Sequence, residues 1–138
     1  MRAEAIFVPV AVLAIWTIAV LFLTGARRVR AVRAGRVPAR AFRFGESAEV
    51  PAEVAVVNRH LMNLLEMPLL FYVVVLGFYV TRQASAGVVL LSWAYVALRL
   101  MHSFVHLGSN RIIPRLATFA AGNVTLLALW LWLLWRVL

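Results

Sequence analysis

Residues 6–24 read IFVPVAVLAIWTIAVLFLT, an apolar stretch that contains no charged side chain. The hydrocarbon core of a bilayer is about 30 Å thick, and an α-helix of roughly 20 apolar residues crosses it. A secretory signal peptide is shorter and ends in a small-residue cleavage site, whereas here positive charge follows the stretch from Arg27 onward. The sequence therefore predicts a membrane-spanning helix that the mature protein keeps.

Three further apolar blocks follow at about residues 52–80, 85–107 and 115–137. Gly108, Ser109 and Asn110 separate the last two blocks by a short turn, which predicts antiparallel neighbouring helices. The predicted fold is all-α, a single domain over residues 1–138 that forms an integral membrane four-helix bundle. Its expected helices span about residues 5–33, 51–81, 85–108 and 114–137, with a basic loop at about residues 27–50.

Composition agrees with a membrane protein and excludes several classes of function. The apolar share is 64%, against roughly 45–50% in soluble domains. The net charge of +9 would suggest nucleic acid in a soluble chain, but beside such apolar blocks it favours membrane topology and anion binding instead. The chain has no cysteine, so a thiol reaction would need a small molecule to supply the sulfur.

The arginines are distributed unevenly between the two ends of the predicted bundle. One end carries nine of them: Arg27, Arg28, Arg30, Arg33, Arg36, Arg40, Arg43, Arg111 and Arg115. The other end carries Arg2, Arg82 and Arg136. Because basic loops stay in the cytoplasm, both termini are expected on the non-cytoplasmic side. Trp130, Trp132 and Trp135 would then form an aromatic belt at the outer end of the last helix.

Two polar stripes run along the predicted second and third helices. Arg59, Asn63 and Glu66 are spaced i, i+4, i+7, so they share one helix face. The third helix carries the stripe Tyr95, Arg99, His102, His106 and Asn110. Ionisable groups in a membrane cost about 2.5–3.5 kcal/mol each on insertion scales, so the stripes should face each other or a wet cavity.

The structural interpretation of these polar residues is that they stabilise the bundle. Glu66 would neutralise Arg99 or Arg59, and Asn63 would fix the helix register. Asn123 and Thr125 on the last helix are expected to make interhelical contacts. His60 is expected to be a solvated residue near the membrane surface.

A metal site is the second interpretation, and the sequence does not favour it. His102 and His106 stand at i, i+4, a spacing that suits metal ligands. However, the third helix offers no carboxylate, and the neighbouring cation Arg99 opposes a metal ion. The sequence therefore predicts no metal.

The functional interpretation is an anion site at the cytoplasmic ends of the helices. Arg28, Arg59, Arg99 and Arg115 all lie at or just inside that boundary. Guanidinium groups hold carboxylates through paired hydrogen bonds, so a small polycarboxylate is the expected ligand.

These motifs resemble the MAPEG family, the membrane-associated proteins in eicosanoid and glutathione metabolism. Residues 58–71, NRHLMNLLEMPLLF, are similar to the family's second-helix motif, with Arg59, Asn63, Glu66 and Pro68 in register. Residues 97–111, ALRLMHSFVHLGSNR, carry the third-helix signature of an arginine followed by a histidine three positions later. Arg115 and the segment TGARRVR, residues 24–30, match two further basic positions. The resemblance covers nearly the whole chain.

The resemblance implies a homotrimer with glutathione, as co-substrate, bound between subunits near the cytoplasmic face. Arg115 would be the catalytic residue beside the sulfur. The expected glutathione-binding residues are Arg28, Arg59, Asn63, Glu66, Arg99, His102 and His106. The implied function is a transferase or peroxidase that acts on apolar small molecules or lipid hydroperoxides arriving from the membrane lipids. The expected location is a bacterial inner membrane, crossed several times.

A non-catalytic membrane module is the alternative hypothesis. His106 stands where the family often has a tyrosine, and Met67 where a polar residue is frequent. The chain would then be a lipid-binding scaffold or an accessory subunit of a larger membrane complex. A channel or transporter subunit is less favoured, because the sequence has no inverted repeat or pair of interrupted helices.

Overall fold

The computed structural model describes residues 2–43, 45 and 47–138, and in these residues it contains four long helices. They are α1 (Phe7–Arg33), α2 (Ala52–Val80), α3 (Ala86–Leu107) and α4 (Ile112–Val137). Two short 3-10 turns, η1 (Ala3–Ile6) and η2 (Ala39–Phe42), precede and follow α1. Each of the four helices is long and apolar enough to cross a membrane. The protein is an all-α, multi-pass integral membrane protein.

The helix ends lie within two residues of the predicted positions, and local chemistry accounts for several of them. Ser85 precedes α3 and its Oγ accepts a hydrogen bond from the Val88 amide at 3.4 Å, a typical N-cap. Gly35 follows α1 at φ +67°, where a side chain would be strained. α1 continues to Arg33, so Arg27, Arg28 and Arg30 are helical and lie on α1 although the predicted basic loop begins at residue 27.

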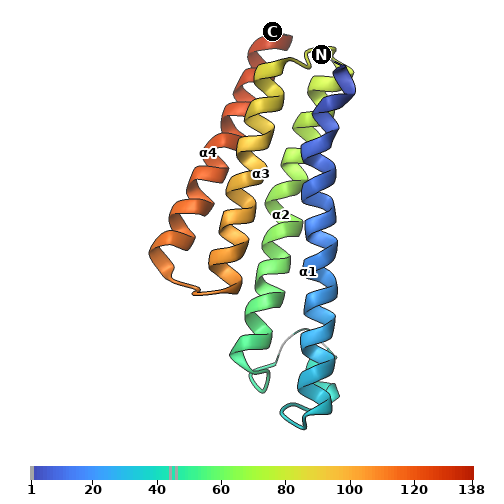
Figure 1. Cartoon of the computed structure of the whole chain (residues 1–138), viewed down its shortest axis with the longest axis vertical. Helices are drawn as coiled ribbons and strands as arrows, with labels where there is room; N and C mark the ends of the chain where they lie inside the picture. The colour runs from blue at the N-terminus through green and yellow to red at the C-terminus, as the bar shows by residue number, and fades with distance from the viewer. Residues whose placement is uncertain (1, 44, 46) are drawn as a thin grey trace.

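The helices form two pairs that lie side by side (Figure 1). The long helices α1 and α2 make one pair, and α3 and α4, joined by a short turn, make the other (Figure 1). The two ends of the chain lie together, and the α1–α2 connection and the α3–α4 turn point the other way (Figure 1). The basic connections are therefore at the opposite end of the bundle from the termini.

The core runs between all four helices and is held by aromatic and branched side chains. The rings of Phe71 on α2 and Tyr95 on α3 stack at 4.5 Å between centroids. α4 approaches closely, because a Cβ on Gly77 would meet a Leu133 methyl at 2.7 Å. Many large apolar residues face outward, as expected of helices solvated by lipid.

The three tryptophans of the predicted aromatic belt differ in how far they are buried in the bundle. Trp130 and Trp132 are partly buried against the core, and Trp132 packs edge-on to Phe78 at 6.3 Å. Trp135 is exposed, near the end of α4.

Candidate functional site

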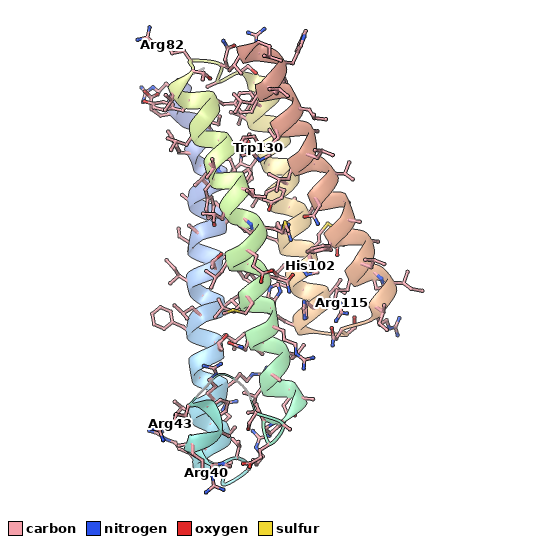
Figure 2. The ribbon with its side chains drawn as sticks, turned by 180° about the vertical axis from the view of Figure 1, so that it is seen from behind. Arg40, Arg43, Arg82, His102, Arg115 and Trp130 are labelled. Atoms are coloured by element: carbon pink, nitrogen blue, oxygen red, sulfur yellow. The ribbon has the colours of Figure 1, made fainter. Side chains whose placement is uncertain are left out.

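A cavity of about 590 Å³ lies between α2, α3 and the start of α4. Figure 2 shows His102 on α3 and Arg115 on α4 near the α3–α4 turn, on the same side of the bundle. The cavity is lined by Asn58, Arg59, Met62, Asn63, His102, His106, Ile112, Arg115, Leu116 and Phe119. Three helices that are separate in the sequence thus contribute to one site.

The polar wall of the cavity contains two guanidinium groups. Arg59 and Asn63 are one helical turn apart on α2, and Asn63 donates to the Arg59 carbonyl at 3.0 Å. Arg115, in the first turn of α4, donates from Nη1 to Oδ1 of Asn110 at 2.7 Å. Asn110 has φ 47°, a left-handed conformation that asparagine tolerates better than most residues. The turn thereby holds the Arg115 side chain.

Part of the cavity lining is apolar and reaches the surface of the bundle. It is formed by Met62 of α2 and by Ile112, Leu116 and Phe119 of α4. Ile112 is 71% exposed and Leu116 is 63% exposed. The cavity lining therefore combines two guanidinium groups with apolar side chains that are exposed at the bundle surface.

Three histidines meet beside this cavity, and all three are buried. His102 and His106 line it, with His106 Nδ1 3.5 Å from His102 Nε2. The ring of His60 on α2 is tilted against both, its centroid 5.0 Å from that of His106 and 5.7 Å from that of His102. His60 Nε2 lies 2.7 Å from Ser103 Oγ.

The prediction that His60 is solvated is wrong, since its exposed fraction is 0%. One helical signal could have placed it correctly. His60 lies on α2 at helical spacing from Leu64 and Phe71, which are core residues. Its neighbour Arg59 points about 100° away around the helix and is exposed.

Arg99 lies behind the cavity wall instead of lining it. It is 1% exposed, and its guanidinium carbon is 5.2 Å from the ring centroid of Phe119. Its Nε donates to the Tyr95 hydroxyl at 2.9 Å, and its Nη2 donates to Asn123 Oδ1 at 2.7 Å. The hypothesis that Glu66 neutralises Arg99 is therefore wrong, because the Arg99 partners are neutral and Glu66 is exposed.

The remaining predicted residues behave differently from one another. The interhelical role of Asn123 is confirmed by its bond from Arg99, whereas Thr125 donates within its own helix to the Ala121 carbonyl. Glu66 is exposed on α2 and does not line the cavity. Arg28 of α1 lies apart from it, with its guanidinium carbon 5.2 Å from the Phe42 ring centroid. Within one chain, Arg59, Asn63, His102, His106 and Arg115 converge, and Arg28, Glu66 and Arg99 do not join them.

The chain is similar over nearly its whole length to a known protein family. Curated proteins give no match to the chain. Residues 6–135 match the MAPEG family, a span that includes all four helices except the last residues of α4. The chain, four membrane helices with Arg59 and Asn63 facing Arg115 across one cavity, belongs to the MAPEG family.

Proposed function

We propose that the protein is a membrane-bound transferase or peroxidase that uses glutathione, or a similar small thiol, against apolar electrophiles or lipid hydroperoxides. The observation that carries this proposal is the cavity that Arg59, Asn63 and Arg115 line together. Family membership supports the same general class of function.

The polar and the apolar side chains that line the cavity suit two substrates of opposite polarity. Glutathione is a small anion with two carboxylates, which guanidinium groups bind well. The exposed apolar wall of Ile112 and Leu116 suits a lipid-soluble electrophile. A site of this kind brings a water-soluble thiol and a membrane-dissolved substrate within reach of each other.

Arg115 is the proposed catalytic residue, because it can stabilise the thiolate. A free thiol has a pKa of about 8.5, and the thiolate is the nucleophile. Lowering that pKa by ~2 units requires about 2.7 kcal/mol of preferential interaction with the thiolate. The Arg115 guanidinium, held by Asn110 beside apolar side chains, would supply this energy. His102 and His106, on the same wall, would bound the thiol end of the ligand.

A homotrimer accounts for the predicted residues that stand apart from the cavity. Glu66 is exposed on the outer face of α2, and Arg28 lies on α1. We propose that neighbouring subunits place these side chains at the glutathione that Arg59 and Asn63 bind. The glutathione would enter from the basic, cytoplasmic end of the bundle, in a bacterial inner membrane.

Activity of the purified protein tests the proposal. Wild type in lipid nanodiscs is given glutathione with a chloronitrobenzene, and separately with a fatty-acid hydroperoxide. Arg115→Ala should lower kcat/KM by roughly 100-fold, the equivalent of about 2.7 kcal/mol. Arg111→Ala is the matched control, because Arg111 is exposed in the same turn and does not line the cavity. It should retain the wild-type rate.

Thermal unfolding separates binding from turnover. A ligand at 100 times its Kd adds about 2.7 kcal/mol to the stability of the folded state. Glutathione at millimolar concentration should therefore stabilise wild type and stabilise Arg59→Ala less. Rates equal to the uncatalysed background, together with no stabilisation, would instead identify a non-catalytic membrane module.

A further inference from the structure

We propose that His60, His102 and His106 form a binding site for a divalent transition metal ion of the Zn²⁺ type. They are the only histidines in the sequence, and the fold brings all three together from two helices. Each offers one ring nitrogen, and these nitrogens lie within 4.8 Å of one another. This site goes beyond the proposed thiol chemistry and does not depend on it.

The hydrogen bonds of Ser103 decide which nitrogen of His60 is free. Ser103 Oγ donates its only hydrogen to the Arg99 carbonyl at 3.0 Å. It must therefore accept from His60 Nε2 at 2.7 Å, so Nε2 carries the proton. His60 Nδ1 then holds a lone pair, and this buried atom has no hydrogen-bond partner. A buried polar atom without a partner is costly, and a metal ion would satisfy it.

The environment of His102 also leaves one of its ring nitrogens with a free lone pair. Its Nδ1 lies 3.1 Å from the Arg115 carbonyl, which can only accept, so Nδ1 carries the proton and Nε2 holds the lone pair. Histidine ligands commonly donate the other ring N–H to a backbone carbonyl in this way. His60 and His102 are thus both oriented by outer partners with a lone pair to spare.

The spacing of the ring nitrogens is close to that of a metal site. Zn–N bonds of about 2.0–2.1 Å in a tetrahedron place ligand nitrogens roughly 3.3 Å apart. His106 Nδ1 and His102 Nε2 are 3.5 Å apart, which is long for a hydrogen bond but near this ligand spacing. Since all three ligand nitrogens lie within 4.8 Å of one another, ring rotation has to shorten any separation by at most about 1.5 Å for a tetrahedral ion.

Three guanidinium groups lie around the histidine cluster. Their positive charge affects which fourth ligand a metal ion would take there. Arg59 and Arg115 line the cavity that His102 and His106 also line, and Arg99 is held behind Phe119. Their charge opposes a bare cation, and one of them, Arg99, is with the missing carboxylate on α3 the reason that the sequence alone predicts no metal. They favour an ion whose open position, toward the cavity, carries an anion such as hydroxide or thiolate. Three imidazoles with one open position are a known arrangement for zinc.

The cluster also has a second approach from the basic end of the bundle. His106 lines a smaller cavity of about 280 Å³ together with Arg27, Glu53 and Asn110. Glu53 Oε1 accepts a hydrogen bond from Arg36 at 2.7 Å, so this carboxylate is already paired with a cation. The smaller cavity nevertheless reaches the buried His106, and a metal site requires such an entry path.

Two isosteric variants distinguish a metal site from a structural cluster. His60→Gln keeps a donor at the Nε2 position for Ser103 and removes the Nδ1 lone pair. His102→Asn keeps a donor at the Nδ1 position for the Arg115 carbonyl and removes the Nε2 lone pair. A merely structural role is preserved in both. Asn63→Ala is the control, because Asn63 lines the same cavity without offering a ring nitrogen.

The measurement is Zn²⁺ titration of protein purified through a tag without histidine and stripped with EDTA. Wild type and Asn63→Ala should bind one Zn²⁺ per chain. Each isosteric variant should lose at least about 100-fold in affinity, as loss of a ligand exceeds the 10–100-fold effect of outer partners. Equal affinity in wild type and variants, or no uptake by wild type, would overturn the proposal.

Spectroscopy of the wild-type protein keeps the test decisive if a variant fails to fold. Co²⁺ substituted at this site should give the intense visible absorption of a four-coordinate ion. X-ray absorption at the zinc edge should show three imidazole nitrogens in the first shell. A shell of oxygens alone would show that the ion binds elsewhere and that the histidines are only a packed cluster.

Discussion

Arg99 on α3 donates a hydrogen bond from Nη2 to Oδ1 of Asn123 on α4 at 2.7 Å. The guanidinium is almost fully buried, and among the described residues its other side-chain acceptor is the Tyr95 hydroxyl. An arginine inside a membrane protein needs polar partners, because lipid does not solvate it. The Arg99–Asn123 bond therefore links α3 and α4, two of the three helices that line the cavity.

Asn123→Ala should destabilise the folded protein by about 1–3 kcal/mol, because it leaves a buried charged donor without its acceptor. Thermal or denaturant unfolding in detergent measures this loss. Thr125→Ala is the matched control, since Thr125 bonds only within α4 and should change stability by less than roughly 0.5 kcal/mol. Equal effects of the two substitutions would mean that Arg99 finds other partners.

Two buried serines on α3 give a second comparison. Ser92 and Ser103 are both 0% exposed, and each donates to the carbonyl four residues earlier. Ser103 also accepts from His60 Nε2 and from Trp16 Nε1, at 2.7 and 2.9 Å. Ser103→Ala strands both donors and should cost about 1–3 kcal/mol for each. Ser92→Ala should be nearly neutral, because a serine bond to its own helix adds little. Unfolding experiments that give the two variants equal stability would contradict this network.

The helices and the polar stripes could be predicted because they depend on local order along the chain. Apolar length predicted the four spans. The i, i+4 spacing placed Arg59 with Asn63, and the i, i+3 and i, i+7 spacings placed Arg99 with His102 and His106. Those spacings say which residues share a helix face but not which neighbouring helix that face meets. Arg99 was therefore expected in an anion site, whereas its face turns to Asn123 of α4.

The role of His60 could not be inferred from residue type alone. A polar residue one position after Arg59 suggests a shared wet surface, but a step of 100° turns it into the core. Its partners are Ser103, 43 residues later, and the rings of His102 and His106. Only the packing of α2 on α3 brings these groups together, so this cluster is a property of the fold and not of any local motif.

Asn110→Gly should impair the proposed reaction by releasing Arg115. Glycine accepts the left-handed backbone of Asn110 but removes the Oδ1 that accepts from Arg115 Nη1. With the guanidinium less well oriented, kcat should fall roughly 10-fold or more, while KM for glutathione changes less.

Steady-state kinetics in nanodiscs separate the two constants. Arg82 is the other left-handed non-glycine residue among those described, and it lies at the far end of the bundle from Arg115 (Figure 2), so Arg82→Gly should leave both constants unchanged. A rise in KM for glutathione with kcat unchanged would instead assign Arg115 to substrate binding.

The orientation of the bundle can be tested with single cysteines, because the chain has none of its own. Nine arginines lie toward the end with the α1–α2 connection and the α3–α4 turn, and three toward the other. Positive loops stay in the cytoplasm, so a cysteine at Ser109 should face inward and one at Thr81 outward. Both positions are exposed, which makes them equally reactive controls for each other.

A membrane-impermeant maleimide added to intact bacterial spheroplasts should label Thr81→Cys at once and Ser109→Cys only after permeabilisation. The opposite pattern would place Arg59 and Arg115 on the outer side, where cytosolic glutathione cannot reach them, and would remove the thiol from the proposed function.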